Sequence, residues 1–151
     1  MHLTIRAPVV EELPALSELC MRSKAVWGYD AAFMAACRAE LTFDPGDIDT
    51  SRIAVATRDD SVLGVAQVRM IGPDADLQKL FVEPATLRGG VGKALFAWAI
   101  EAARDMGAVR MTIEADPDAA PFYRRLGARD AGLAPSGSIS GRTLPKLVLD
   151  F

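Results

Sequence analysis

The chain has 151 residues, half of them hydrophobic and a quarter charged, with a formal net charge of −3. This composition excludes a disordered chain, and the length predicts one domain, residues 1–151, that buries roughly 68–70% of its unfolded surface. No apolar run approaches the ~20 residues of a membrane span and no signal-peptide pattern opens the chain, so we expect a cytoplasmic protein without a membrane partner. Because Lys and Arg cluster only in pairs, we expect no nucleic-acid partner.

The first half of the chain begins with a strand pattern and continues with two helical patterns. The strand is expected at Leu3–Arg6, and apolar residues recur at helical spacing over Val10–Ala25 and about Asp30–Leu41. Arg52–Thr57 and Val62–Met70 then alternate as strands around a turn-prone polar segment, which predicts a hairpin.

The second half alternates strand and helix patterns without a repeat or a long linker. A long helix is expected between a glycine-rich loop and Gly107, with Trp98 on its buried stripe. A short helix near the C-terminal third has Asp118 as its expected N-cap and Gly127 as its stop. The other elements predicted here are strands at Asp76–Val82, Arg110–Glu114, Ala128–Ala134 and Leu144–Phe151.

Metal and disulfide chemistry find little support in the sequence. Cys20 and Cys37 are the only cysteines, and neither belongs to a CxxC motif or a histidine spacing. Each lies in a helical pattern, so buried reduced thiols are expected rather than a disulfide or a metal site. We therefore predict no bound metal.

The most informative segment is a strand that stops at Pro84 and is followed by three glycines in four positions, Gly89, Gly90 and Gly92. Glycine lets the backbone approach a ligand closely, and the unpaired N–H groups at the start of a helix favour an anion. The pattern predicts a phosphate cradle. It is not a Walker loop, because Ala94 follows Gly92-Lys93 where Ser or Thr would bind magnesium, nor a dinucleotide fingerprint, because Leu95 stands where a third glycine is needed.

This segment resembles the acyl-CoA loop of the GNAT acetyltransferase superfamily, in which a strand ending in Val-x-Pro precedes Gln/Arg-x-x-Gly-x-Gly/Ala. Gly90 and Gly92 fill the glycine positions, whereas Leu87 departs from the usual Gln or Arg. Asp116-x-x-Ala119 followed by Phe122-Tyr123 and Gly127 resembles the second signature of the same family. The resemblance extends to the order of elements and implies an α/β (α+β) fold with a mixed sheet of about seven strands and about four helices.

The resemblance implies acetyl-CoA as cosubstrate and an amine as acceptor, and it assigns residues to the cofactor. The pyrophosphate would lie on backbone N–H groups near the helix start, with mobile positive charge from Arg88 and Lys93. The pantetheine arm would pair with the open strand that ends at Val82, with Asp116 on its other side. The residues expected at the cofactor are Leu80, Phe81, Val82, Arg88, Gly89, Gly90, Val91, Gly92, Lys93, Asp116, Ala119 and Phe122.

Transfer to an amine needs a base and an acid. An amine of pKa ~10.4 costs about 4.6 kcal/mol to deprotonate at pH 7. Asp76 stands at the position where family members carry a base. Period-two spacing places its side chain on the same face of the strand as Leu80 and Val82. The alternative is that Asp76 belongs to the turn before this strand. Tyr123 is the expected acid for the CoA thiolate, because the pKa of a phenol, ~10, is close to that of an alkyl thiol. Phe122 also fits the pattern of an ordinary core aromatic.

The acceptor pocket is expected in the family's first two helices and the segment before the last strand. Trp27 and Tyr29 in the first interhelical loop are its predicted walls, with Arg22 as a substrate contact and Lys24 and Arg142 as further cations for a substrate carboxylate. The predicted function is acetyl transfer to a primary amine of a small molecule or amino acid. A protein or peptide acceptor and a non-catalytic acyl-CoA sensor remain as alternatives, and a homodimer is compatible with the sequence.

Overall fold

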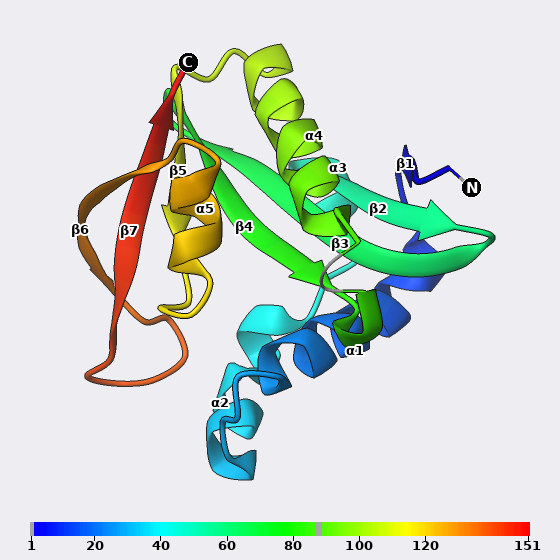
Figure 1. The fold of residues 1–151 in the computed structure, drawn as a ribbon, viewed down its shortest axis with the longest axis horizontal. Helices are drawn as coiled ribbons and strands as arrows, with labels where there is room; N and C mark the ends of the chain where they lie inside the picture. Colours follow the sequence, from blue (N-terminus) through cyan, green and yellow to red (C-terminus); the bar gives the residue numbers. More distant parts are fainter. Residues whose placement is uncertain (1, 87–88) are drawn as a thin grey trace.

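A computed structural model of the chain describes residues 2–86 and 89–151. Its centre is a seven-stranded sheet with the order β1-β2-β3-β4-β5-β7-β6 (Figure 1). Neighbouring strands run antiparallel except β4 and β5, which are parallel. The strands are β1 (Thr4–Arg6), β2 (Arg52–Arg58), β3 (Ser61–Ile71), β4 (Asp74–Val82), β5 (Arg110–Glu114), β6 (Arg129–Pro135) and β7 (Thr143–Asp150).

Five α-helices accompany the sheet in the described residues, one more than the sequence predicted. The additional helix, α3, has four residues, too few for an apolar period to be recognised. The carboxylate of Asp47 accepts the N–H of Asp44 at 2.8 Å at its start. The helices are α1 (Leu13–Ala25), α2 (Ala31–Leu41), α3 (Asp47–Thr50), α4 (Val91–Asp105) and α5 (Ala120–Arg125), with short 3-10 turns η1 (Val10–Glu12) and η2 (Pro84–Thr86).

The helices cover both faces of the sheet (Figure 1). On one face α4 and α5 pack through Phe96 and Tyr123 onto Met111 and Leu147 of the strands. On the other face α1 and α2 bury a second apolar cluster, which contains both cysteines as free thiols, as predicted. None of the described helices is both long and apolar enough to cross a membrane.

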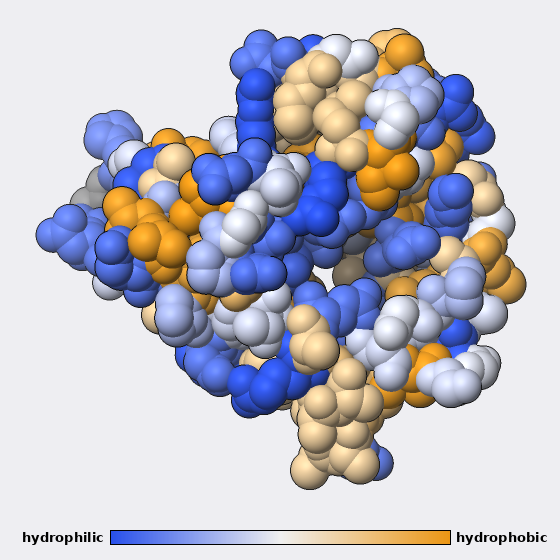
Figure 2. Space-filling view, turned by 180° about the vertical axis from the view of Figure 1, so that it is seen from behind, coloured by the Kyte–Doolittle hydropathy of each residue, from blue (hydrophilic) through white to orange (hydrophobic). Residues whose placement is uncertain are grey.

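The sheet opens between its two parallel strands. Hydrogen-bonded register joins β4 to β5 only at Ala75 with Met111 and at Asp76 with Thr112. Beyond these pairs the strands diverge, so the C-terminal half of β4 has β3 as its neighbour on one side and no strand on the other (Figure 1). Figure 2 shows a hollow near the middle of the molecule, where this opening lies.

A β-bulge in β4 changes which face each side chain occupies. Gln67 of β3 pairs with Lys79 and Val68 pairs with Leu77, so Gln78 is an extra residue in β4. The expected face of Asp76 is therefore wrong: the bulge reverses the alternation, and Asp76 faces away from the side where Leu80 packs on the α4 cluster. Period-two spacing cannot reveal an inserted residue.

The start of α5 also differs from the prediction. The helix begins at Ala120, and the carboxylate of Asp116 accepts the N–H of Asp118 at 3.0 Å. The carbonyl of Asp116 accepts N–H groups of Ala119 and Ala120 at 2.8 and 3.0 Å. Asp116, rather than Asp118, thus satisfies the free N–H groups ahead of the helix.

Candidate active site

A cavity of about 440 Å³ occupies the opening between β4 and β5. The diverging strands form its walls, the glycine-rich start of α4 lies at one end, and parts of α1, α2 and the β6–β7 loop complete it. Of the residues predicted at the cofactor, the cavity is lined by Leu80, Phe81, Val82, Gly90, Gly92, Lys93, Asp116, Ala119 and Phe122.

The glycine end of this cavity presents the backbone N–H groups that begin α4. Gly90 is the N-cap of α4 in a left-handed conformation, with φ of 77°, which glycine adopts without strain. Ala94 makes the first hydrogen bond of the helix, to the carbonyl of Gly90 at 3.0 Å. The N–H groups of Val91, Gly92 and Lys93 precede that bond and have no backbone acceptor among the described residues, as is usual at a helix N-terminus. Arg125, which the sequence analysis missed, lines the cavity here, whereas Arg88 lies outside the described residues.

Two of the predicted cofactor residues have a different environment. Val91 is fully buried and packs into the core cluster of Leu95 and Val82, so only its backbone faces the start of the helix. Gly89 forms part of the turn before α4, where its N–H donates to the carbonyl of Thr86 at 3.0 Å.

Tyr123 lies at the wall of the cavity, at the side of α5. Its ring packs edge-to-face on Phe96 and Phe122, with centroid distances of 5.4 and 5.0 Å. The side chain is 6% exposed, and burial raises the pKa of the phenol. No hydrogen bond to its hydroxyl forms within the described residues, so that group is free for a ligand in the cavity.

The structure separates two carboxylates that could act as a base. Asp76 does not line the cavity; its carboxylate accepts from Gln78 at 2.5 Å and from Thr112 at 2.9 Å. Glu114, at the end of β5, does line it. Burial raises the pKa of Glu114, and the charges of Asp76 and Glu40 raise it further. Glu114 could not be singled out from the sequence, because a glutamate at the end of a short strand carries no distinctive pattern.

A polar cluster around Asp116 joins the elements that border the cavity. One oxygen of its carboxylate accepts from Tyr29 at 2.6 Å and from Lys24 at 3.3 Å, and Arg142 lies 3.7 Å away. Arg142 also donates to the Tyr29 hydroxyl at 2.8 Å. Burial acts to raise the pKa of Asp116, but these hydrogen bonds and the charge of Lys24 outweigh it and lower the pKa.

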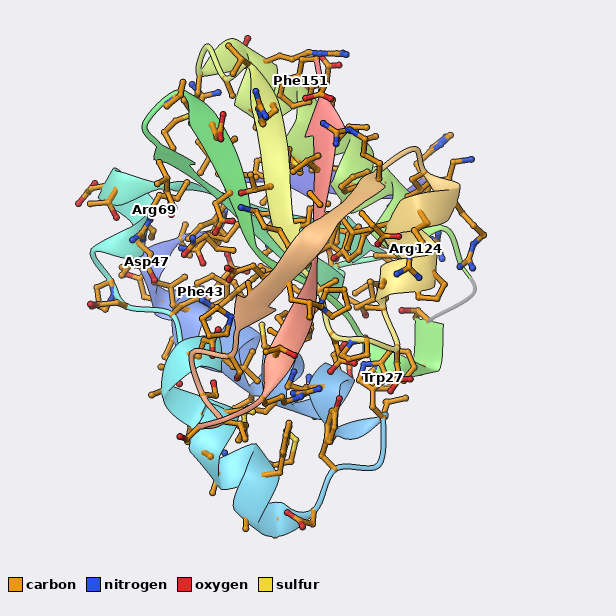
Figure 3. All side chains as sticks on the ribbon, turned by 90° about the vertical axis from the view of Figure 1, so that its left-hand side faces the viewer. Trp27, Phe43, Asp47, Arg69, Arg124 and Phe151 are labelled. Atoms are coloured by element: carbon orange, nitrogen blue, oxygen red, sulfur yellow. The ribbon has the colours of Figure 1, made fainter. Side chains whose placement is uncertain are left out.

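Only one of the three residues predicted at the acceptor, Trp27, lines the cavity. Trp27 lines the cavity with 43% of its surface exposed, beside η2 in Figure 3. Tyr29 is turned to Asp116 and stacked on Phe33 at 4.0 Å between ring centroids. Arg22 pairs with Glu83 at 2.8 Å. Neither Tyr29 nor Arg22 lines the cavity.

Further cavity residues escaped the sequence analysis. Lys79 is buried in β4 and lines the cavity, as does Glu40 of α2, which accepts a hydrogen bond from Ser138. A lone lysine within the apolar run Leu77–Val82 was the available signal for the first of these. Across the described residues, no group of three or more His, Cys, Asp or Glu side chains is placed to hold a metal.

Solved structures share this fold over the whole chain. The PaiA N-acetyltransferase of Thermoplasma acidophilum, in complex with coenzyme A, matches with a TM-score of 0.80 at 16% identity, covering 100% of both chains. The ribosomal-protein-S18-alanine N-acetyltransferase of Escherichia coli matches with a TM-score of 0.71 at 18% identity, covering 99% of this chain and 94% of that one.

YncA of Salmonella typhimurium, solved with its cofactor acetyl-CoA, matches with a TM-score of 0.71 at 20% identity, covering 99% of this chain and 94% of that one. No protein with a curated description matches the sequence. The family model described as the acetyltransferase (GNAT) family matches residues 17–128, from α1 to the end of α5. With the open β4–β5 pair and the glycine-started helix at its site, the chain belongs to the GNAT family of acetyltransferases.

Proposed function

We propose that this acyltransferase moves the acetyl group of acetyl-CoA to a primary amine of a small molecule or amino acid by direct attack. The observation that carries the proposal is one cavity that joins the first N–H groups of α4 to Tyr123 and to the charged residues Glu114 and Lys79. The cavity thus offers an anion site, a proton donor and polar groups for an acceptor.

The residues at the glycine end fit the pyrophosphate of CoA. Three free N–H groups and the helix dipole favour an anion there, and the side chains of Lys93 and Arg125 add positive charge. The unpaired edge of β4, from Leu80 to Val82, leaves backbone groups for the amides of the pantetheine arm. When bound, acetyl-CoA supplies an acetyl thioester that an amine can attack.

The base acts on the acceptor, whose ammonium must lose a proton before attack. We propose that Glu114 takes this proton, because it lines the cavity and its raised pKa makes it a stronger base than an exposed glutamate. Asp76 then acts through Glu114, since its charge contributes to that raised pKa. Direct proton transfer to Asp76, as predicted from the sequence, is the competing assignment.

The acid acts on the leaving group. As the amine nitrogen bonds to the acetyl carbon, the carbon–sulfur bond breaks, and the second proton that the nitrogen loses replaces the one that the acid gives up. The departing thiolate of CoA needs that proton from an acid. The hydroxyl of Tyr123 holds one, and the raised pKa of that phenol keeps it protonated over the physiological range.

The Asp116 cluster favours a small acceptor over a protein or peptide. Tyr29, Lys24 and Arg142 converge on one carboxylate and hold the α1–α2 loop to the β6–β7 loop at the cavity. A peptide would need an open groove between these two loops. The cytoplasmic location and a homodimer stay predictions from the sequence.

An acetyl-CoA turnover assay, reading released thiol against a panel of amines, amino acids and peptides, tests the proposal. Thiol release with small amines, lost in Tyr123→Phe, is the expected result. Release with peptides alone would identify a protein acetyltransferase. Calorimetric binding of CoA without any release would identify a sensor, and no binding would overturn the cofactor assignment.

A further inference from the structure

Lys79 is a buried lysine that has no counter-ion in the part of the chain that the structure describes. Its residue is 8% exposed, and its Nζ lies 4.7 Å from the centre of the Phe43 ring. It donates one hydrogen bond, to Oε1 of Gln67 at 3.1 Å. An ammonium group has three donors, so two remain without a protein acceptor among the described residues.

The surroundings of Lys79 are fixed by their own bonds. Nε2 of Gln67 donates to Ser51 at 3.0 Å, which turns Oε1 toward the lysine. The charge of Asp47 acts on Lys79, but Asp47 forms its ion pair with Arg69, at 2.8 Å. Asp47 and Arg69 lie side by side in Figure 3. No carboxylate of the described residues lies within ion-pair distance of Lys79. A buried charge without a partner is costly, and such a group gains by binding an anion.

The other cations expected to bind a substrate carboxylate are already engaged. Lys24 and Arg142 share the carboxylate of Asp116, and Arg22 is paired with Glu83 outside the cavity. Lys79 lines the same cavity from its β4 wall.

Opposite charge lines the cavity as well. Glu114 and Glu40 are lining residues, and neither forms an ion pair within the described chain. Lys79, Glu40 and Glu114 line the same cavity, and the charge of Glu40 acts on each of the other two. The cavity thus offers a cation and two carboxylates that form no ion pair among the described residues.

We propose that Lys79 binds the carboxylate of the acceptor while Glu114, supported by Glu40, receives its ammonium, so that the acceptor is an amino acid. This assignment rests on the proposed acetyl transfer and names its substrate class. Lys79 is a specificity-determining residue: it contacts the substrate but takes no part in proton transfer. Binding a zwitterion matches both charges and leaves the Gln67 hydrogen bond intact.

The test compares amino acids with amines that lack only the carboxylate, such as alanine with ethylamine and 4-aminobutyrate with propylamine. The parent protein is expected to prefer at least one amino acid by about tenfold or more in kcat/KM, as for hydrogen bonds to a charged group. Lys79→Met should abolish this preference by raising KM for the amino acid, with the value for the amine unchanged. Lys79→Gln, neutral but able to bond Gln67, should behave in the same way.

Lys146→Met is the matched control, because Lys146 stands opposite Glu114 in the β5–β7 register and its charge acts on Glu114, but it does not line the cavity. It should keep the preference. An unchanged preference in Lys79→Met, or a parent enzyme that prefers the amines, would overturn the inference while leaving acetyl transfer standing. If no amine is acetylated, the proposed function fails, but the inference about Lys79 can still be tested by calorimetry with 4-aminobutyrate and alanine on CoA-loaded protein. Binding to the parent that is lost in Lys79→Met supports the carboxylate site. No binding to the parent refutes it.

Discussion

Gly92 and Phe122, one from each of the two sequence motifs, are in direct contact: a β-carbon on Gly92 would lie 3.3 Å from Cζ of Phe122. The start of α4 is therefore held against α5, and the absence of a side chain at position 92 serves packing as well as the approach of an anion. A substitution at Gly92 is therefore expected to affect the stability of the fold as well as the binding of CoA.

Gly92→Val should abolish CoA binding and also lower Tm, because its methyl groups press on Phe122 and project toward the anion site. Pairing it with Phe122→Leu should recover much of the stability, since the ring atoms are removed, but not the affinity for CoA. Calorimetry and thermal unfolding measure the two effects. Full CoA affinity in the folded double variant would refute the anion site at this helix.

Tyr123→Phe should lower kcat by about 10²-fold, the low end for a positioned acid, with affinity for acetyl-CoA unchanged within a few fold. The change removes a buried hydroxyl that has no partner among the described residues, so Tm should not fall. Single-turnover kinetics and unfolding curves on the same preparation check both. Parent-like kcat would show that solvent protonates the thiolate.

The two carboxylates near the β4–β5 opening predict different pH profiles. A base works only when ionised, so kcat/KM should fall as the pH drops through the raised pKa of Glu114. Glu114→Gln should remove this acid limb and lower kcat by about 10²-fold. Asp76→Asn removes a repelling charge and should shift the limb to lower pH. If Asp76 were the direct base, the large loss would appear in Asp76→Asn instead.

The Asp116 cluster predicts a pH-dependent contribution to stability. The pKa of this carboxyl is lowered in the folded protein, so its stabilisation is present above the unfolded value of about 3.9 and is lost as the pH falls through the folded value. Asp116→Asn should cost about 1.5–3 kcal/mol at pH 7, as for hydrogen bonds to a charged group, and flatten this dependence. Asp130→Asn, which breaks an exposed pair with Arg124, is the control and should cost about 0–1 kcal/mol.

Trp27→Ala should raise the KM of the acceptor while acetyl-CoA still binds. Trp27 lines the cavity and is 43% exposed. The substitution should therefore lower the free energy of unfolding by much less than the ~3–5 kcal/mol lost when a core tryptophan is truncated. Steady-state kinetics with thermal unfolding separate the two effects. A large fall in Tm with unchanged acceptor KM would show that Trp27 supports the fold alone.

The family and the cofactor end of the site could be predicted from local sequence. Backbone-mediated anion binding needs glycines at the start of a helix, and this requirement leaves a contiguous pattern in Gly90 and Gly92. The order of strands and helices followed from apolar periodicity, since each long element buries one face. The four-residue helix α3 and the cap at Asp116 escaped because they depend on hydrogen bonds between residues two to four positions apart, which leave no apolar period in the sequence.

The acceptor end was decided by tertiary structure. One extra residue at Gln78 turns Asp76 away from the face of Leu80, and no spacing rule records a bulge. Asp116 binds the polar groups of Tyr29, Lys24 and Arg142, whereas Lys79 has no counter-ion among the described residues. Both facts depend on contacts between distant segments. Sequence shows which charges a chain carries, whereas only the packing of β4, β5 and the loops shows which of them stay free to bind a substrate.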